Sequence, residues 1–544
     1  MLSTIGMSAS EVTLKLPPIF SDNMVLQQGQ EIPVWGWADP GTIVSVSCSP
    51  KKTTISTMVD KSGKWKVKLP SFRAGGPYQM QIIARNKENS KQTEVITFKN
   101  VMIGEVWLCS GQSNMEMPVG MSWGKVLNYE KEIQDANYPN IRLITVPHKV
   151  AFTPQSDFES NGWVECSPKN VDSFSATAYF FGRALYQDLK VPIGLIHSSW
   201  GGTRIEPWTS TESISQFPEY GKQLQAMRST SSDIVIAKKE YETKLANWKQ
   251  ELFDKDPGFI NGVPVWANPD LDTKGWNPMQ LPQFWEDAGL PNFDGTVWFR
   301  KEVNLPESWA GKELIVTLGP TDDWDITWFN GTKIGNTDWY NTPRKYTIPG
   351  ELVKSGKNVI AVRVIDTGGA GGFSGKPADM QLMLANPQPE INPIPLSGIW
   401  QYKIAYDLNT ISPQPLDPSQ PFYATTLYNG MIAPLVPYGI RGAIWYQGES
   451  NAGDAFKYRA LFPTMIKDWR TKWHQPELPF LFVQLANFMA TKPEPAEDNW
   501  AELREAQSMT LSLPKTGMAV AIDIGEALDI HPKNKQEVGR RLAL

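Results

Sequence analysis

The chain has 544 residues, of which 41% are hydrophobic and 20% are charged, and its net charge is −5. This balance is typical of a soluble globular protein, and the length exceeds that of a single ordinary core, so about three domains are expected. An acidic chain is a poor partner for nucleic acid, and no apolar run approaches the roughly 20 residues that cross a bilayer. Composition therefore favours a neutral or weakly polar substrate.

The cysteines and the first residues of the chain are the sequence features that could indicate the cellular compartment. Cys48, Cys109 and Cys166 show no metal-ligand spacing, and an odd number of cysteines cannot all pair within one chain. The opening residues MLSTIGMSASEV lack the basic leader and the full apolar segment of a signal peptide, so no intact signal peptide is expected. The 22 tryptophans fit either β-sandwich cores or flat platforms for sugar rings, and composition leaves both open.

Residues 12–99 are predicted to form a small N-terminal β-sandwich. Short alternating segments such as IPVWGWADPG, KWKVKLP and YQMQIIAR are separated by Gly, Pro, Asn and Asp. No helical period interrupts them, and this pattern is typical of a β-sandwich.

Residues 100–256 are predicted to form the first part of an α/β domain with a parallel sheet. Residues 105–111 and 140–146 are apolar runs of strand length, and residues 175–189 have apolar positions at helical spacing. The segment VPIGLIHSSWGG follows as a strand and loop, which gives the alternation of a parallel sheet. Residues 212–256 are rich in Lys, Glu and Gln and predict polar helices.

Residues 257–396 return to a β pattern, with segments such as TVWFRKEVNL and KNVIAVRVID and a turn signal at FNGT. We expect an inserted jelly-roll β-sandwich here. The α/β pattern resumes over residues 397–544, where RGAIWYQGES, LPFLFVQLA and TGMAVAID predict strands separated by helices. The predicted fold class is therefore α/β, with one parallel-sheet domain that an inserted sandwich interrupts and that a smaller sandwich precedes.

The four histidines limit the choice of a general base, because a base for a serine nucleophile is most often His. His148 and His474 lie in polar surroundings, and His197 ends a predicted core strand. His531 lies in the loop ALDIHPKNK, between a predicted strand and a helix, two residues after Asp529. Because ligands bind at strand ends in α/β sheets, His531 is the best-placed base.

The segment SGQSNMEMP supplies the candidate nucleophile. Ser113 follows the strand EVWLCSG at a strand-to-helix turn, where Oγ can face solvent while helix amides point at a ligand. The segment is not a G-x-S-x-G elbow, because Met115 occupies the last position. Taken alone, the position is better explained by a serine that caps a helix.

Two further loops supply candidate oxyanion donors. In WYQGESNAG, the side-chain amides of Gln447 and Asn451 could donate, and in SSWGGTRIEPW the glycines Gly201 and Gly202 allow close approach of the backbone. Each motif alone is equally well explained as an ordinary turn or loop. Because all these loops follow predicted parallel strands of one domain, we expect them to meet at one sheet edge.

The segments GQSNMEMPV, SSWGGTRIEPW, WYQGESNA and DIHPKNKQEVGRRLA resemble the signature segments of sialate O-acetylesterases, within the SGNH-hydrolase superfamily. The resemblance implies an SGNH-like α/β core and hydrolysis of acetyl esters on sialic acid or other sugars. It implies Ser113 as nucleophile, His531 as base and Asp529 as the residue that orients the base. Neither a metal nor an organic cofactor is implied, and the expected location is periplasmic or extracellular.

The sequence departs from the superfamily pattern in two places. One residue separates Asp529 from His531, whereas the usual spacing is D-x-x-H, so Asp523 is the reserve acid. The usual G-x-N-D block is replaced by QGESN, so the side-chain oxyanion donor is Gln447 or Asn451, with Gln447 preferred because it lies nearer the strand end. Family members also tend to continue beyond the last helix seen here, so further residues are expected after it.

Several rival functions remain open from sequence. An acetyl-polysaccharide esterase of xylan type would use the same chemistry. A glycoside hydrolase would need two carboxylates about 5–9.5 Å apart, for which Glu105, Glu116 and Glu449 are candidates. A non-catalytic carbohydrate-binding protein would work through its sandwiches alone, and a lipase is disfavoured because no apolar lid segment is present. The expected partner is an O-acetylated carbohydrate, and the sequence leaves the sugar, the ester position and the oligomeric state open.

Overall fold

The computed structural model describes the chain except for residues 1–11, 50–52, 88–91, 292 and 387–390. The start of the chain, where no intact signal peptide is expected, therefore lies outside the described residues. Contacts divide the chain into two compact units, which consist of residues 1–237 with 417–544 and of residues 238–416.

The first part of the larger unit consists of strands and turns. The strands are β1 (Leu14–Lys15), β2 (Val25–Gln27), β3 (Ile32–Ala38), β4 (Ile43–Cys48), β5 (Thr54–Met58), β6 (Lys64–Leu69), β7 (Gly75–Arg85) and β8 (Thr93–Gly111). Strands β1, β3 and β6 form one sheet. In another sheet, β4 pairs with both β5 and β7, and β7 pairs with β8. Every second residue of β3 is buried, as expected for strands with one face toward a core.

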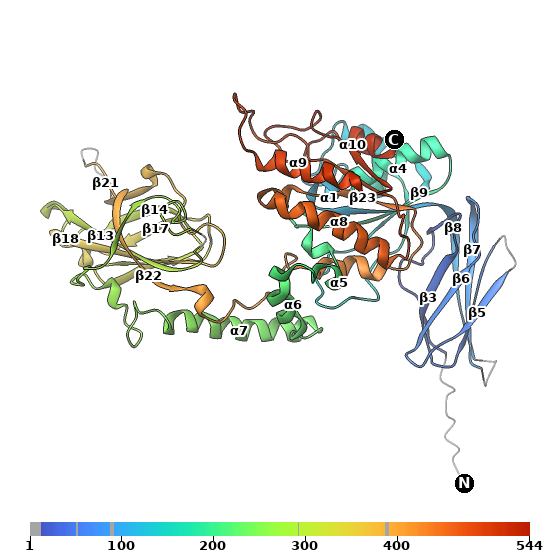
Figure 1. Ribbon diagram of the computed structural model, residues 1–544, viewed down its shortest axis with the longest axis horizontal. Helices are drawn as coiled ribbons and strands as arrows, with labels where there is room; N and C mark the ends of the chain where they lie inside the picture. Colours follow the sequence, from blue (N-terminus) through green and yellow to red (C-terminus); the bar gives the residue numbers. More distant parts are fainter. Residues whose placement is uncertain (1–11, 50–52, 88–91, 292, 387–390) are drawn as a thin grey trace, which may run out of the picture. The chain divides into compact units, whose positions relative to one another are not determined.

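Strand β8 is 19 residues long and joins two kinds of sheet. Its first part pairs with β7 in antiparallel register, from Thr93 opposite Arg85 to Ile103 opposite Gly75. Its second part, from Glu105, pairs in parallel register with the strands of the α/β domain. The boundary predicted between residues 99 and 100 falls inside this strand, so the N-terminal strands and the α/β sheet share one element (Figure 1).

The α/β sheet has the strand order β10-β9-β11-β8-β23-β24-β25, and neighbours are parallel except for β10. Its further strands are β9 (Tyr138–Thr145), β10 (Val164–Cys166), β11 (Ile193–Ser199), β23 (Gly442–Tyr446), β24 (Phe480–Val483) and β25 (Thr516–Ala519). All residues of β11 and β23 are buried, as expected for parallel strands covered on both faces. The predicted α/β fold is confirmed.

Helices cover this sheet (Figure 1). The helices of this unit before and after the smaller unit are α1 (Ser113–Glu116), α2 (Tyr129–Gln134), α3 (Pro168–Val171), α4 (Ala176–Leu189), α5 (Thr211–Ile214), α6 (Gly221–Arg228), α8 (Ala455–Lys472), α9 (Asn499–Met509) and α10 (Lys535–Ala543). Helix α10 packs closely on α4, because a Cβ at Gly539 would lie only 2.5 Å from the backbone nitrogen of Phe181. The core between sheet and helices includes Met115, Phe180, Leu195 and Val538.

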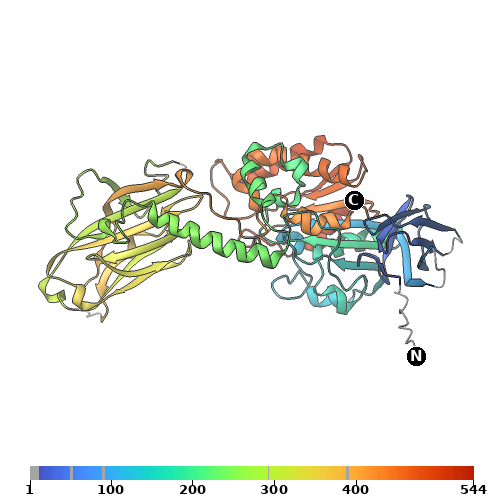
Figure 2. The ribbon, with the colours of Figure 1, turned by 90° about the horizontal axis from the view of Figure 1, so that it is seen from below.

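Helix α7 (Ile234–Asp254) is a single continuous helix that leads into the smaller unit (Figure 2). The strands of that unit are β12 (Asn277–Leu281), β13 (Gly295–Leu305), β14 (Leu314–Asp322), β15 (Trp324–Phe329), β16 (Thr332–Thr337), β17 (Pro343–Ile348), β18 (Gly356–Asp366), β19 (Gly372–Phe373), β20 (Met380–Leu384), β21 (Ile394–Pro395) and β22 (Gly398–Asp407). Among the described residues they form two sheets, in the orders β12-β22-β13-β18-β15-β16 and β17-β14-β20-β21, with β19 paired to β14. One core cluster draws residues from both sheets, including Phe299 and Leu382.

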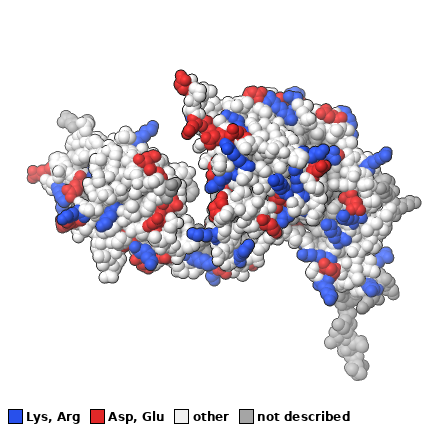
Figure 3. All heavy atoms as spheres, viewed as in Figure 1, with Lys and Arg blue, Asp and Glu red and all other residues white. Residues whose placement is uncertain are grey.

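The cysteines and the surface charge complete this description. Cys48, Cys109 and Cys166 are free and buried, and burial raises the pKa of Cys48 to about 11 and that of Cys166 to about 12. None of the described helices is long and apolar enough to cross a membrane. On the face that Figure 3 shows, acidic and basic side chains are interspersed over both units.

Candidate active site

The ends of three adjacent parallel strands place the predicted loops at one edge of the sheet. Strands β11, β8 and β23 are neighbours, and their following loops carry Gly201, Ser113 and Gln447. A Cβ at Gly201 would lie 3.3 Å from Ser113 Cβ, and the backbone amide of Gln112 donates to the carbonyl of Tyr446 at 2.9 Å. The predicted convergence of these loops is therefore present.

Ser113 and His531 form a hydrogen bond although 418 residues separate them. The distance between Ser113 Oγ and His531 Nε2 is 2.9 Å. Ser113 is the first residue of α1, and the residue in the cap position is Gln112, so the alternative interpretation of Ser113 as a helix cap is wrong. The edge of the half-exposed Trp123 ring packs against the His531 imidazole, with ring centres 5.1 Å apart.

The local backbone explains why the serine is presented here. Gly111 ends β8 at φ +145°, and a Cβ at this position would overlap the carbonyl oxygen of Tyr446 in β23. A glycine is therefore required where the chain leaves the sheet and turns into α1. The side-chain oxygen of Gln112 then accepts hydrogen bonds from the amides of Gly448 and Ser450, which fixes this turn against the loop after β23.

Three influences set the pKa of His531. Burial lowers it first, the positive charge of Lys535 lowers it further, and the Asp529 carboxylate opposes both. The net pKa lies below the ordinary value for histidine. An imidazole with a lowered pKa is neutral at pH 7 and is able to accept a proton.

The two candidate acids differ in their surroundings. Asp529 Oδ1 lies 3.8 Å from His531 Nδ1 and accepts a hydrogen bond of 2.9 Å from the His531 backbone amide. Asp523 is engaged by both terminal nitrogens of Arg541 at 2.5 and 2.7 Å. The hydrogen bond from Arg541 lowers the pKa of Asp523 to about 2. The structure thus brings Asp529, and not the Asp523 carboxylate, toward His531.

The candidate oxyanion donors are mostly engaged in other hydrogen bonds. The Gly201 amide donates to Glu116 Oε2 at 2.5 Å. The Gln447 amide nitrogen donates to Asn451 Oδ1 at 2.7 Å and to the Thr203 carbonyl at 3.3 Å, so both of its protons are used. Asn451 is equally buried and donates to Glu206 Oε2 at 3.1 Å.

The engaged amides of Gln447 and Asn451 correct the expected geometry, because both side chains hold the loop together rather than projecting from it. Gly202 differs from the other candidates in its surroundings. It has φ +73° and open space around its Cα, where an added Cβ would meet no atom within 4 Å.

Sequence reasoning missed a cluster behind Gly201. Glu116 accepts from the Gly201 amide and lies 3.0 Å from His148 Nε2, and the His148 ring stacks on Trp200 with centres 4.1 Å apart. Burial raises the pKa of Glu116, but hydrogen bonding to His148 and to the Gly201 amide outweighs it and leaves the pKa lowered. The acidic residue three positions after Ser113 was the available signal, although it also fits an ordinary first-turn acid.

His197 and the remaining candidate carboxylates have partners within the protein. His197 is buried, its Nε2 lies 2.6 Å from Ser199 Oγ, and burial lowers its pKa to about 4. Glu105 accepts a hydrogen bond from Gln28 at 2.6 Å, and Glu449 accepts one from Asn114 at 2.6 Å. With Glu116 bound to Gly201, each carboxylate considered for glycoside hydrolysis therefore has a partner within the protein.

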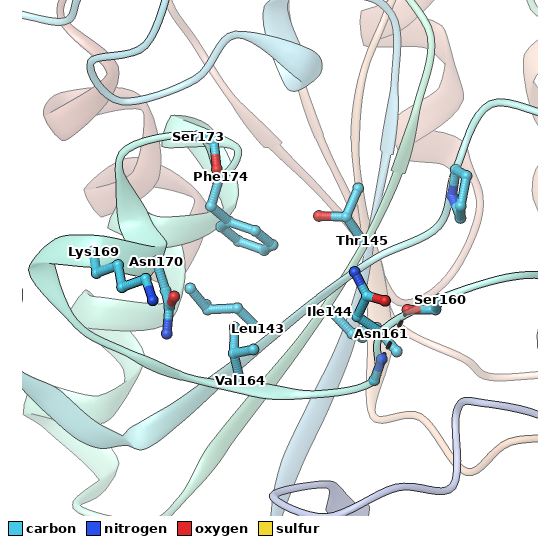
Figure 4. Close-up of a pocket in the computed structure, with 12 residues that line it drawn as sticks. Leu143, Ile144, Thr145, Ser160, Asn161, Val164, Lys169, Asn170, Ser173 and Phe174 are labelled. Carbon is cyan, nitrogen blue, oxygen red and sulfur yellow. Dashed lines mark hydrogen bonds between the residues drawn. The ribbon is translucent and has the colours of Figure 1, made fainter.

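A hollow of about 430 Å³ lies beside the end of β9 (Figure 4). Its lining includes Thr145, Asn161, Lys169, Ser173 and Phe174, and it contains none of the predicted site residues. In the described part of the chain, no three His, Cys, Asp or Glu side chains are grouped so that they could hold a metal ion.

Comparison with known proteins shows which family the chain resembles. The pattern that defines the carbohydrate esterases described as sialic acid-specific acetylesterases matches residues 103–240 and 416–544. These two segments of the chain are similar to this acetylesterase family. The matched residues include Ser113 and His531 and exclude most of the smaller unit. The predictions of a carboxylic ester hydrolase and of a carbohydrate esterase are confirmed.

Individual proteins similar to this chain are also acetylesterases. The mouse (Mus musculus) sialate O-acetylesterase is 25% identical over 557 aligned residues, which cover 96% of this chain and 71% of the relative. The human (Homo sapiens) sialate O-acetylesterase is 33% identical over 207 residues, which cover 36% of this chain and 38% of the relative. A carbohydrate acetylesterase from Xanthomonas citri has a similar structure, with a TM-score of 0.56, 26% identity and coverage of 98% of this chain and 74% of that one.

Proposed function

We propose that this carbohydrate esterase removes acetyl groups from sialic acid or other acetylated sugars, with Ser113 as the nucleophile and His531 as the general base. The observation that carries the proposal is the 2.9 Å hydrogen bond between Ser113 Oγ and His531 Nε2. A nucleophile within hydrogen-bond reach of a base is the arrangement that activates a serine.

The reaction follows from this pair. His531 takes the Ser113 proton as Oγ attacks the acetyl carbonyl, and it then returns the proton to the departing sugar hydroxyl. The product of this half-reaction is an acetyl-enzyme. Water, deprotonated by the same imidazole, then attacks the acetyl-enzyme and releases acetate.

Asp529 is the proposed third member of the triad. A carboxylate beside Nδ1 favours the tautomer in which Nε2 is free to accept a proton, and it stabilises the imidazolium that forms. The 3.8 Å separation from Nδ1 is longer than a hydrogen bond, so Asp529 acts here through its charge.

The oxyanion is proposed to bind backbone amides first. The amide of Ser113 begins α1, and helix geometry provides no partner for an N–H at this position. The amide of Gly202 lies in the glycine loop after β11 and is the second donor. The Gly201 amide, Gln447 and Asn451 remain predicted donors, and each would have to leave the hydrogen bonds described above.

Replacing Ser113 with Ala tests the nucleophile. Ser113→Ala should reduce hydrolysis of an activated acetate ester by about 10⁴-fold or more, because loss of a triad member leaves only binding and oxyanion stabilisation. His531→Ala should lower the rate comparably, since the two residues act as a unit. Ser173→Ala, which alters an exposed serine in the hollow beside the end of β9, is the matched control and should retain the parent rate. Parent-level activity in Ser113→Ala would remove the assignment.

The proposal names acetylated sialic acids as substrates, with acetylated plant polysaccharides of xylan type as the alternative. The names of the relatives favour sialic acid. Parallel assays of acetate release from both substrates would distinguish the two. Turnover of an aryl glycoside without esterase activity would instead support the glycoside hydrolase.

Two finer assignments belong to the same proposal. The jelly-roll β-sandwich expected over residues 257–396 is supported by the two sheets of the smaller unit and their shared core, although β22 (Gly398–Asp407) extends these sheets beyond residue 396. The smaller sandwich expected over residues 12–99 is supported by the sheets that β1 to β7 form with one another and with β8. The resemblance to carbohydrate esterases is also the basis on which we propose a periplasmic or extracellular location. The proposed reaction at Ser113 does not depend on the sandwich folds or on the location.

A further inference from the structure

Two buried side chains outside the proposed triad connect the loop of His531 to the turn of Ser113. Asn114 Nδ2 donates to the carbonyl of Ile530 at 2.9 Å. Lys535 Nζ donates to the carbonyl of Pro532 at 2.8 Å and to Asn114 Oδ1 at 2.6 Å. The residues immediately before and after His531 are therefore both held by groups that converge on the residue next to the nucleophile.

We propose that Asn114 and Lys535 form a clamp that positions the His531 imidazole against Ser113. This inference rests on the function proposed above. Both are positioning residues, because their contacts act on the backbone on either side of His531. Asn114 is itself fixed to the core, since its carbonyl accepts a hydrogen bond of 3.0 Å from Thr177 Oγ1.

The burial of Lys535 argues for a role beyond packing. Its side chain is fully buried, and burying an ammonium group is costly unless it is paired and hydrogen-bonded. Its partners are the two oxygens of the clamp and the Tyr446 ring, whose centre lies 5.2 Å from Nζ. An apolar side chain of similar volume would fill the same space without this cost.

Glu449 supplies the opposite charge. Glu449 Oε1 accepts a hydrogen bond of 2.6 Å from Asn114 Nδ2, so the Asn114 amide bridges a buried carboxylate and a buried ammonium group. Because both ends of this amide are used, Asn114 has a single defined orientation. The clamp therefore holds the Ser113 turn and the His531 loop in a fixed relation.

The charges around the clamp make its effect measurable. Burial lowers the pKa of His531, Lys535 lowers it further, and Asp529 opposes the change. Burial also lowers the pKa of Lys535 to about 7, and the carboxylates of Glu449, Asp529 and Glu526 oppose this shift. Removal of the Lys535 charge should raise the pKa of His531.

The decisive variant is Lys535→Met in the full chain. Its matched control is Lys533→Met, which removes the same charge from an exposed position in the same loop. Hydrolysis of an activated acetate ester gives kcat and KM, and an NMR titration of the imidazole C–H signals gives the pKa of His531. Lys535→Met should lower kcat by about 100-fold with little change in KM, since a misplaced base slows the chemical step. The pKa of His531 should rise, and Lys533→Met should change neither quantity.

Asn114→Ala provides a second variant in case Lys535→Met does not fold. It should lower kcat to a similar extent, and Asn114→Asp should not recover the loss, because it replaces the Nδ2 donor to Glu449 and to the Ile530 carbonyl with an acceptor. A folded Lys535→Met or Asn114→Ala with kcat within about twofold of the parent overturns the clamp. So does an unchanged or lowered His531 pKa in Lys535→Met, an equal loss in Lys533→Met, or loss of the cooperative thermal transition in both clamp variants, which would make the pair purely structural.

Failure of the proposed function would look different. Ser113→Ala would then keep the parent rate. The NMR titration of His531 does not depend on turnover, so it would still report whether Lys535 acts on the imidazole.

Discussion

The His531 imidazole must be neutral to accept a proton from Ser113, so the proposed reaction depends on pH through this ring. The pKa of His531 is lowered by burial and by Lys535, so the neutral form persists below the ordinary value of about 6.5. We expect kcat/KM for an acetate ester to fall as the pH drops, with a midpoint below about 6.5. Asp529→Asn should move this midpoint to lower pH, because the carboxylate raises the pKa. A midpoint above the ordinary value would contradict the electrostatics described here.

For individual residues, the sequence predicted the reacting pair better than the buried hydrogen-bond networks around it. Ser113 and His531 could be predicted to meet, because each follows a parallel strand of one sheet. The burial of Lys535 could not be predicted, since lysine is almost always exposed and its side-chain partner, Asn114, is distant in the chain. The hydrogen bonds that the Gln447 side-chain amide makes within the protein could not be predicted either, because the sequence of a polar loop does not show which groups surround such an amide.

At the scale of elements, Gly111 determines how β8 delivers Ser113. Gly111→Ala would place a methyl group against the Tyr446 carbonyl, in a backbone conformation that disfavours side chains. We expect a loss of about 1–3 kcal/mol in the free energy of unfolding and a drop of about 100-fold in kcat/KM as the turn shifts. Denaturant unfolding and ester hydrolysis measure the two effects.

The control for this variant is Gly221→Ala at the start of α6, where an added Cβ meets no atom within 4 Å. It should alter neither quantity appreciably. Parent-like stability and activity in Gly111→Ala would show that the end of β8 can relax without moving Ser113.

Element types were predictable where the hydrophobic period was clear, as in α4 and β11. The unbroken course of β8 was not, because the polar pair Lys99-Asn100 resembles a turn. In the structure Asn100 adopts φ +55°, and its amide donates to Asn23 and Glu165, so the strand continues through a position that sequence marks as a boundary.

At the scale of the whole molecule, two compact units with separate cores should unfold separately. We expect calorimetry of the full chain to give a calorimetric enthalpy larger than the van't Hoff enthalpy, which indicates more than one transition. Loss of esterase activity on heating should follow only the transition of the unit that contains Ser113 and His531. Equal enthalpies with a single peak would show that the units unfold together.

The shared strand β8 also restricts which length changes the gene can tolerate. Side chains alternate between the faces of a strand, so inserting or deleting one residue between Ile103, where the pairing with β7 ends, and Glu105 would exchange the faces of every later position up to Gly111. The part of β8 that pairs with β7 would keep its partners, while the side chains of Trp107 and Leu108 would each point to the opposite face of the sheet. Sequence drift in this family should therefore add or remove residues in loops, while the spacing from β7 pairing to the nucleophile stays constant.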